Sequence, residues 1–106
     1  MIHRIDRHIT KLVALELRQS REEYEVYFNS PHEGYALIAE EFCETESEFV
    51  RVADLLDQIW EDVMDEDVDF EYLYDALKHT KRLVSEAVQT AAMLEKYIES
   101  AEEKGW

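Results

Sequence analysis

Apolar residues recur at intervals of three and four along most of this chain, which is the spacing that places them on one side of an α-helix. In the first part of the chain they fall at Ile2, Ile5, Ile9, Leu12, Val13 and Leu17. Charged and then aromatic residues crowd the positions that follow, and the pattern becomes less regular there. We expect a first helix from about Ile2 to Tyr27.

A second helix is expected to begin directly after Ser30. Serine is a common N-cap residue, Pro31 suits the first helical position, and Glu33 completes a capping box. A heptad stripe then runs without interruption through Tyr35, Ile38, Phe42, Thr45, Phe49, Val52, Leu56, Ile59 and Val63. This pattern predicts one long helix that ends near residue 64.

A run of mostly acidic residues, Asp65-Glu66-Asp67-Val68-Asp69, separates this helix from a third one. Aspartate favours N-cap positions over helix interiors, so Asp67 or Asp69 can begin the next helix. The stripe of the third helix consists of Phe70, Leu73, Leu77, Thr80, Val84, Ala87, Ala91, Leu94, Ile98 and Ala101. Gly105 marks its expected end.

The two long stripes fit one another if the chain reverses at the acidic turn. Antiparallel partners then have residue numbers with a constant sum, which holds for Val63/Phe70, Leu56/Leu77, Phe49/Val84, Phe42/Ala91 and Tyr35/Ile98. We therefore predict an all-α fold. In it, a long-helix antiparallel hairpin packs through these stripes, and an N-terminal helix covers part of the hairpin.

The predicted hairpin is too long for one small core. Residues 1–106 have room for a single helical domain, yet each arm of about thirty residues extends ~45 Å. Several large aromatic residues also lie off the stripes: Trp60, Trp106, Tyr72, Tyr74 and Tyr97. We expect a homo-oligomer, either a dimer or a tetramer, to cover the remaining apolar surface and complete a helical bundle.

The charge balance narrows the range of partners. The chain has 26 acidic residues against 11 Lys and Arg, a formal net charge of −15, which disfavours direct binding to nucleic acids and to anionic lipids. No apolar run approaches the ~18 residues of a membrane span, and the charged Met1–Arg4 segment lacks a signal-peptide core. The single cysteine, Cys43, is expected to be buried and suits a reducing compartment, so we expect a cytoplasmic protein.

Two polar groups stand out from the helical pattern. Within about a quarter-turn of the second helix lie four glutamates, Glu40, Glu41, Glu44 and Glu48. They repel one another, and a divalent cation would relieve the repulsion, although an ordinary solvated face is the alternative. One face of the third helix carries His79, Arg82, Glu86, Gln89, Met93 and Tyr97, which suits a ligand site or a subunit interface. The residue-number rule places both groups level along the hairpin but splayed outward.

The segment Glu40-Glu41-Phe42-Cys43-Glu44 matches the E-E-x-x-E element of the MazG-type all-α nucleotide pyrophosphohydrolases. Residues 28–36 (FNSPHEGYA) and 85–93 (SEAVQTAAM) are similar to short family members from phages and prophages, and the resemblance extends over residues 28–100. It implies that Glu41, Glu44 and Glu86 are catalytic ligands of Mg²⁺, with Mn²⁺ as a substitute. It also implies cleavage of a nucleoside triphosphate to a monophosphate and pyrophosphate.

One position departs from the family pattern. The later E-x-x-D element appears here with Gln89 in place of the aspartate. The resemblance makes Gln89 a metal ligand and a substrate contact, but its neutral amide contributes no charge to a bound metal. Glu40 and His32 are the other candidate substrate-binding residues. His32 lies near the start of the second helix, where packing or capping of the loop is the alternative role.

Three functions remain open from the sequence. The first is a Mg²⁺-dependent nucleoside triphosphate pyrophosphohydrolase or a degenerate relative of one. The second is a non-catalytic helical interaction module, which Gln89 favours. The third is an acidic polyanion mimic that occupies the groove of a basic protein, which the clustering of the acidic residues disfavours.

Overall fold

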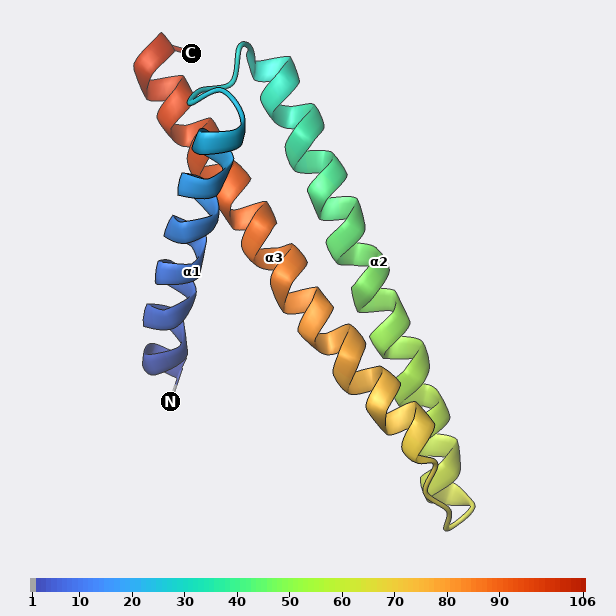
Figure 1. Cartoon of the computed structure of the whole chain (residues 1–106). Coiled ribbons are helices and arrows are strands. Elements are labelled where there is room, and N and C mark those ends of the chain that lie inside the picture. Colours follow the sequence, from blue (N-terminus) through green and yellow to red (C-terminus); the bar gives the residue numbers. More distant parts are fainter. Residues whose placement is uncertain (1) are drawn as a thin grey trace.

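The computed structural model describes the backbone of residues 2–106 and the side chains of residues 4–106. The expectation about the Met1–Arg4 segment therefore lies largely outside the described residues. Across residues 2–106 the chain forms three α-helices and no strand: α1 (Ile2–Glu23), α2 (Pro31–Met64) and α3 (Phe70–Lys104). α2 and α3 lie side by side and are joined by a short turn, whereas α1 lies against α3 (Figure 1). The all-α prediction is confirmed.

Local capping fixes three helix boundaries at the predicted places. The Ser30 hydroxyl accepts a hydrogen bond from the backbone N–H of Glu33 (3.1 Å) at the start of α2. The Asp69 carboxylate accepts one from the backbone N–H of Glu71 (2.9 Å) at the start of α3. Gly105 ends α3 in the left-handed region (φ 70°), which glycine adopts without steric cost.

α1 ends at Glu23, so the predicted end at Tyr27 is wrong. The cause is Phe28, which is only 1% exposed. Its backbone N–H donates to the Ser100 hydroxyl (2.9 Å), and its carbonyl oxygen accepts from the Lys104 ammonium (2.6 Å). Both sides of this residue are therefore bound to α3, and the chain must leave the axis of α1 early to reach them.

α2 and α3 meet along a line of mixed polar and apolar positions, which we call the seam. The seam consists of Glu41, Thr45, Glu48, Val52, Leu55, Ile59 and Asp62 on α2 and of Tyr72, Ala76, His79, Leu83, Glu86 and Thr90 on α3, all of them buried or half-buried. Side-chain contacts cross it between the hydroxyls of Thr45 and Thr90 (3.1 Å) and between Oε2 of Glu48 and Nδ1 of His79 (2.6 Å). Their residue numbers require the two helices to run antiparallel.

The predicted packing of the two heptad stripes against each other is wrong for the large apolar residues of α3 and for five of the nine stripe positions of α2. Nine of their large members point to solvent and are between 50% and 71% exposed: Tyr35, Phe42, Phe49, Leu56, Val63, Phe70, Leu77, Val84 and Ile98. We call these nine residues the apolar stripe. Each follows a buried or half-buried position by one residue, so α3 is rotated by about 100° from the predicted orientation. α2 is rotated less, since Ile38, Val52 and Ile59 stay half-buried.

The one-residue offset gives the hairpin two different sides. In an antiparallel pair, positions that follow the contact line by one residue point to the same side on both helices. Positions that precede the contact line point to the opposite side. The apolar stripe therefore forms one continuous face of the hairpin, and residues such as Glu40 and Gln89, which precede seam positions, lie on the other face.

α1 packs against α3 through its C-terminal half. Val13 and Leu17 form a small core with the fully buried Ala92, and Val88 and Ala91 flank it. The N-terminal half of α1 diverges from α3 (Figure 1). Three apolar side chains of that half are exposed: Ile5, Ile9 and Leu12. The resulting molecule is elongated, at 59 × 29 × 22 Å.

Gly34 allows the first turn of α2 to approach α3. A Cβ atom at this position would lie 2.6 Å from Cδ2 of Tyr97 and 3.0 Å from Cδ2 of Phe28. Both distances are too short for a carbon–carbon contact, so any side chain here would push these rings aside. The first turn of α2 therefore packs directly on the rings of Tyr97 and Phe28.

Candidate functional site

Three carboxylates converge in the seam. Glu41 and Glu44 lie one turn apart on α2, Glu86 faces them from α3, and one oxygen of each lies within 4.8 Å of the other two. We call these three residues the carboxylate cluster. The helix rotation described above brings them together, because Glu41 and Glu86 occupy seam positions. The expected outward splay of these residues is therefore wrong.

Two residues of the cluster, Glu41 and Glu86, are half-buried, and Glu44 is exposed. Burial raises the pKa of Glu41, and repulsion from Glu44, Glu40 and Glu16 raises it further. Burial also raises the pKa of Glu86, as do a hydrogen bond with Glu44 and repulsion from nearby carboxylates. Oε2 of Glu41 and Oε2 of Glu86 are buried and have no hydrogen-bond partner among the described residues. A cation between the helices would satisfy both atoms and remove the repulsion.

The adjoining seam contacts hold the two helices at a fixed distance. The Thr45 and Thr90 hydroxyls are in contact (3.1 Å) beside the cluster, one residue after Glu44 on α2 and four residues after Glu86 on α3. Glu48, one turn after Glu44 on α2, contacts His79 (2.6 Å) and so has a partner of its own. This contact with His79 distinguishes Glu48 from the three cluster residues.

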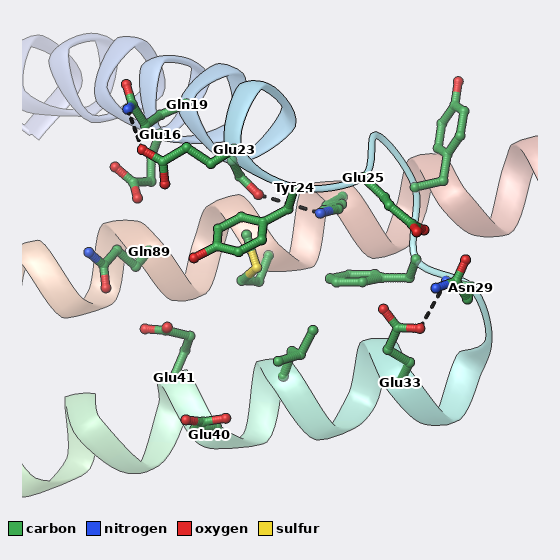
Figure 2. A pocket seen from close by; sticks show the side chains of 16 residues that line it. Glu16, Gln19, Glu23, Tyr24, Glu25, Asn29, Glu33, Glu40, Glu41 and Gln89 are labelled. Atoms are coloured by element: carbon green, nitrogen blue, oxygen red, sulfur yellow. Dashed lines mark hydrogen bonds between the residues drawn. The ribbon is translucent and has the colours of Figure 1, made fainter.

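A cavity of about 620 Å³ opens beside the cluster, between α1, the α1–α2 connection, α2 and α3 (Figure 2). Its six acidic lining residues are Glu16, Glu23, Glu25, Glu33, Glu40 and Glu41. Its remaining lining residues are Gln19, Ser20, Tyr24, Tyr27, Phe28, Asn29, Leu37, Gln89, Met93 and Lys96. Because Glu41 belongs to both, the cavity opens directly onto the cluster. Its volume falls within the ~300–1,000 Å³ typical of small-molecule sites.

The structure brings some of the predicted substrate-binding residues together and not others. Glu40 and Gln89 line the cavity, and Figure 2 shows Gln89 on α3 across from Glu41 on α2. His32 is exposed on the first turn of α2 and is not among the lining residues. Cys43 is exposed, so its predicted burial is wrong. It lies two residues past a seam position and therefore points away from α3.

Several lining residues were not expected from the sequence. Tyr24 and Phe28 lie in the α1–α2 connection, whose path depends on long-range contacts with α3 that no local pattern reveals. Lys96 could have been recognised from the sequence as part of the same helix face, because it lies three residues after Met93 and seven after Gln89 on α3. Its buried ammonium is the main feature that the sequence pattern left unassigned.

The chemistry available to this site is that of hard oxygen ligands. Carboxylates in this number bind Mg²⁺, Mn²⁺ or Ca²⁺ in proteins. The group comes from two helices whose separation is fixed by packing, so its geometry does not depend on a mobile loop. The cavity beside it has both apolar walls and hydrogen-bonding groups, as a site for an organic ligand requires.

Comparisons with known proteins do not assign a function to this site. In the part of the chain that the structure describes, no helix has an apolar stretch suited to crossing a bilayer. The chain matches no protein-family model, and comparison with curated proteins and with solved structures gave no match.

Proposed function

We propose that this protein is a Mg²⁺-dependent nucleoside triphosphate pyrophosphohydrolase, which releases pyrophosphate and a nucleoside monophosphate. One observation supports the proposal most strongly. Glu41, Glu44 and Glu86 approach within 4.8 Å of one another beside a cavity of about 620 Å³. Buried, unpartnered oxygens on two of these residues favour a bound cation over a merely solvated acidic face.

The residues present fit a magnesium ion. Mg²⁺ prefers oxygen ligands, is held by few carboxylates, and retains several waters for contact with substrate phosphates. Glu41, Glu44 and Glu86 would hold it. When bound, the ion supplies Lewis-acid polarisation of the phosphate and lowers the pKa of a bound water. It also offsets the negative charge of the site, which would otherwise repel an anionic substrate.

The rest of the site then orients the nucleotide. The phosphates of the nucleotide lie at the carboxylate cluster. Its sugar and base extend into the cavity toward the N-terminal end of α2. Tyr24, Phe28 and Met93 offer flat and apolar contacts for the base. Gln89 lies between these regions, and its amide N–H groups can donate to a phosphate or ribose oxygen, which an aspartate in its place could not do.

The decisive assay is pyrophosphate release from a panel of standard and modified nucleoside triphosphates with Mg²⁺ or Mn²⁺. Glu41→Gln and Glu86→Gln keep the shape of each side chain and remove one metal-binding charge, so both should abolish turnover. Glu46→Gln is the matched control, since Glu46 is exposed on the same helix and outside the cluster. No turnover by the wild-type protein on any nucleotide, or full turnover by Glu41→Gln, rejects the proposal.

A non-catalytic interaction module is the second candidate, and the uncovered apolar stripe is the observation that favours it. Such a module needs no metal. Calorimetry with Mg²⁺ and a nucleotide therefore separates the two functions, because an interaction module shows no metal-linked nucleotide binding. Gln89→Asp sharpens the comparison, since a large gain in Mg²⁺ affinity would indicate a site that has lost a ligand.

We further propose that the protein is a homodimer in which two hairpins face each other through the apolar stripe. The surface area supports this assembly. The chain exposes 8027 Å², whereas a compact monomer of 12.6 kDa exposes about 6,200 Å². The excess, roughly 1,800 Å², exceeds the ~800 Å² per partner of a standard interface. The product would be a four-helix bundle with each cavity on an outer face.

A further inference from the structure

Lys96 lines the end of the cavity that is farther from the carboxylate cluster. It is only 4% exposed, although lysine is almost never fully buried without a partner. Its ammonium donates a long hydrogen bond to the Ser20 hydroxyl (3.4 Å) and lies 4.8 Å from the centre of the Phe28 ring. These contacts leave donor positions of the ammonium free.

The fold alone does not account for a charge at this position. Burial lowers the pKa of Lys96, as does the nearby Arg21, whereas the carboxylates of Glu33 and Glu25 oppose this effect. The ion pairs found in the described part of the chain do not include Lys96. A methionine would fill similar space and contact Phe28 without the cost of burying a charge. The ammonium is therefore better explained by something that enters the cavity.

Distances along α3 indicate which part of a nucleotide reaches Lys96. It lies ten residues beyond Glu86, a separation of about 15 Å along the helix axis. Its side chain leans back toward the N-terminus of the helix and shortens this gap by only part of its length. Phosphates held by a metal at Glu86 remain near it, so the group that spans the cavity is the base.

We propose that Lys96 determines base specificity by donating a hydrogen bond to a keto oxygen on the far edge of the base. This inference rests on the proposed function. An ammonium has three donors and no acceptor. It pairs with the 4-keto oxygen of uracil or the 6-keto oxygen of hypoxanthine or guanine. Cytosine and adenine carry an amino group at the same position, which is also a donor. Two buried donors that face each other make no hydrogen bond, so these bases are strongly disfavoured.

Binding of nucleoside 5′-monophosphates tests this assignment without requiring hydrolysis, because these ligands lack the bond that the proposed enzyme cleaves. Calorimetric titrations with Mg²⁺ compare UMP with CMP and IMP with AMP. These pairs match in size and differ in the keto or amino group of this edge. We expect the wild-type protein to bind the keto member of each pair at least about tenfold more tightly.

Lys96→Met should reduce this preference to less than about twofold, and Lys96→Gln, whose amide both donates and accepts, should do the same. Lys81→Met is the control, since it removes the same charge from an exposed position on α3. The proposal is overturned if wild-type protein binds neither nucleotide of a pair or both equally, or if a folded Lys96 variant keeps the preference. Circular dichroism establishes that each variant is folded.

Failure of this inference and failure of the proposed function give different results. If pyrophosphate is released but binding shows no preference for keto bases, only the proposed role of Lys96 is rejected. If the preference for keto bases disappears in Lys96→Met and no triphosphate releases pyrophosphate, the proposed role of Lys96 is supported and the proposed hydrolase activity is rejected.

Discussion

Replacement of Phe49 by glutamate tests whether a second copy of the chain covers the apolar stripe. Phe49 is 62% exposed, and a phenylalanine of about 200 Å² therefore leaves ~120 Å² uncovered in the single chain. At about 25 cal/mol per Å², covering this area is worth ~3 kcal/mol for each copy. A symmetric dimer contains the residue twice, so up to ~6 kcal/mol is lost, or about a 10⁴-fold rise in the dimer dissociation constant.

Sedimentation velocity over a range of concentrations measures the effect. We expect the wild type to sediment as a dimer and Phe49→Glu as a 12.6 kDa monomer. Val50→Glu is the matched control, because Val50 is also exposed but points away from the stripe. Added salt should strengthen the wild-type dimer, since each copy carries a net charge of −15. A monomeric wild type at every concentration, or equal weakening by the two variants, refutes the reasoning.

Three further predictions concern stability. Gly34→Ala should lower the free energy of unfolding by about 1–3 kcal/mol because its Cβ meets the Tyr97 ring, and an unchanged chemical denaturation midpoint would contradict this. Ser30→Ala should cost ~1 kcal/mol by the same measurement, through loss of the N-cap of α2, whereas Ser30→Asp should cost little. The third concerns pH: the pKa values of Glu41 and Glu86 are raised in the folded chain, so their protonation favours folding. Metal-free stability should be highest below their ordinary pKa of 4.5 and should fall as pH rises through the raised values. Mg²⁺ at neutral pH should restore the melting temperature in wild type but not in Glu41→Gln, and equal restoration in both would contradict a metal held by the cluster.

Helix boundaries set by neighbouring residues were predictable from the sequence. The Ser30 cap depends on residues three positions away, and the left-handed end of α3 depends on Gly105 itself. The end of α1 was not predictable in this way. It depends on Phe28 binding to Ser100, which lies 72 positions later in the chain.

The orientation of α2 and α3 about their axes was mispredicted for a different physical reason. A heptad pattern identifies the apolar side of a helix, but it does not say which surface covers that side. In this chain a polar line, with Glu48 against His79 and Thr45 against Thr90, forms the contact within one hairpin. The stronger apolar side is left outward. The sequence placed Glu41, Glu44 and Glu86 at a similar level along the hairpin, but it did not predict that they converge, because their convergence depends on this rotation.

The offset between seam and stripe constrains how this chain can vary in length. A single inserted residue in the middle of α2 would turn everything after it by about 100°. It would carry seam residues such as Leu55 to the side of the stripe, turn stripe residues such as Leu56 farther from α3, and bring polar residues such as Asp54 toward α3. Substitutions on the outermost side of each helix disturb none of these surfaces. We therefore expect relatives of this chain to differ freely in outward-facing residues, while gaps in their alignments fall in the α1–α2 connection and at the turn between α2 and α3.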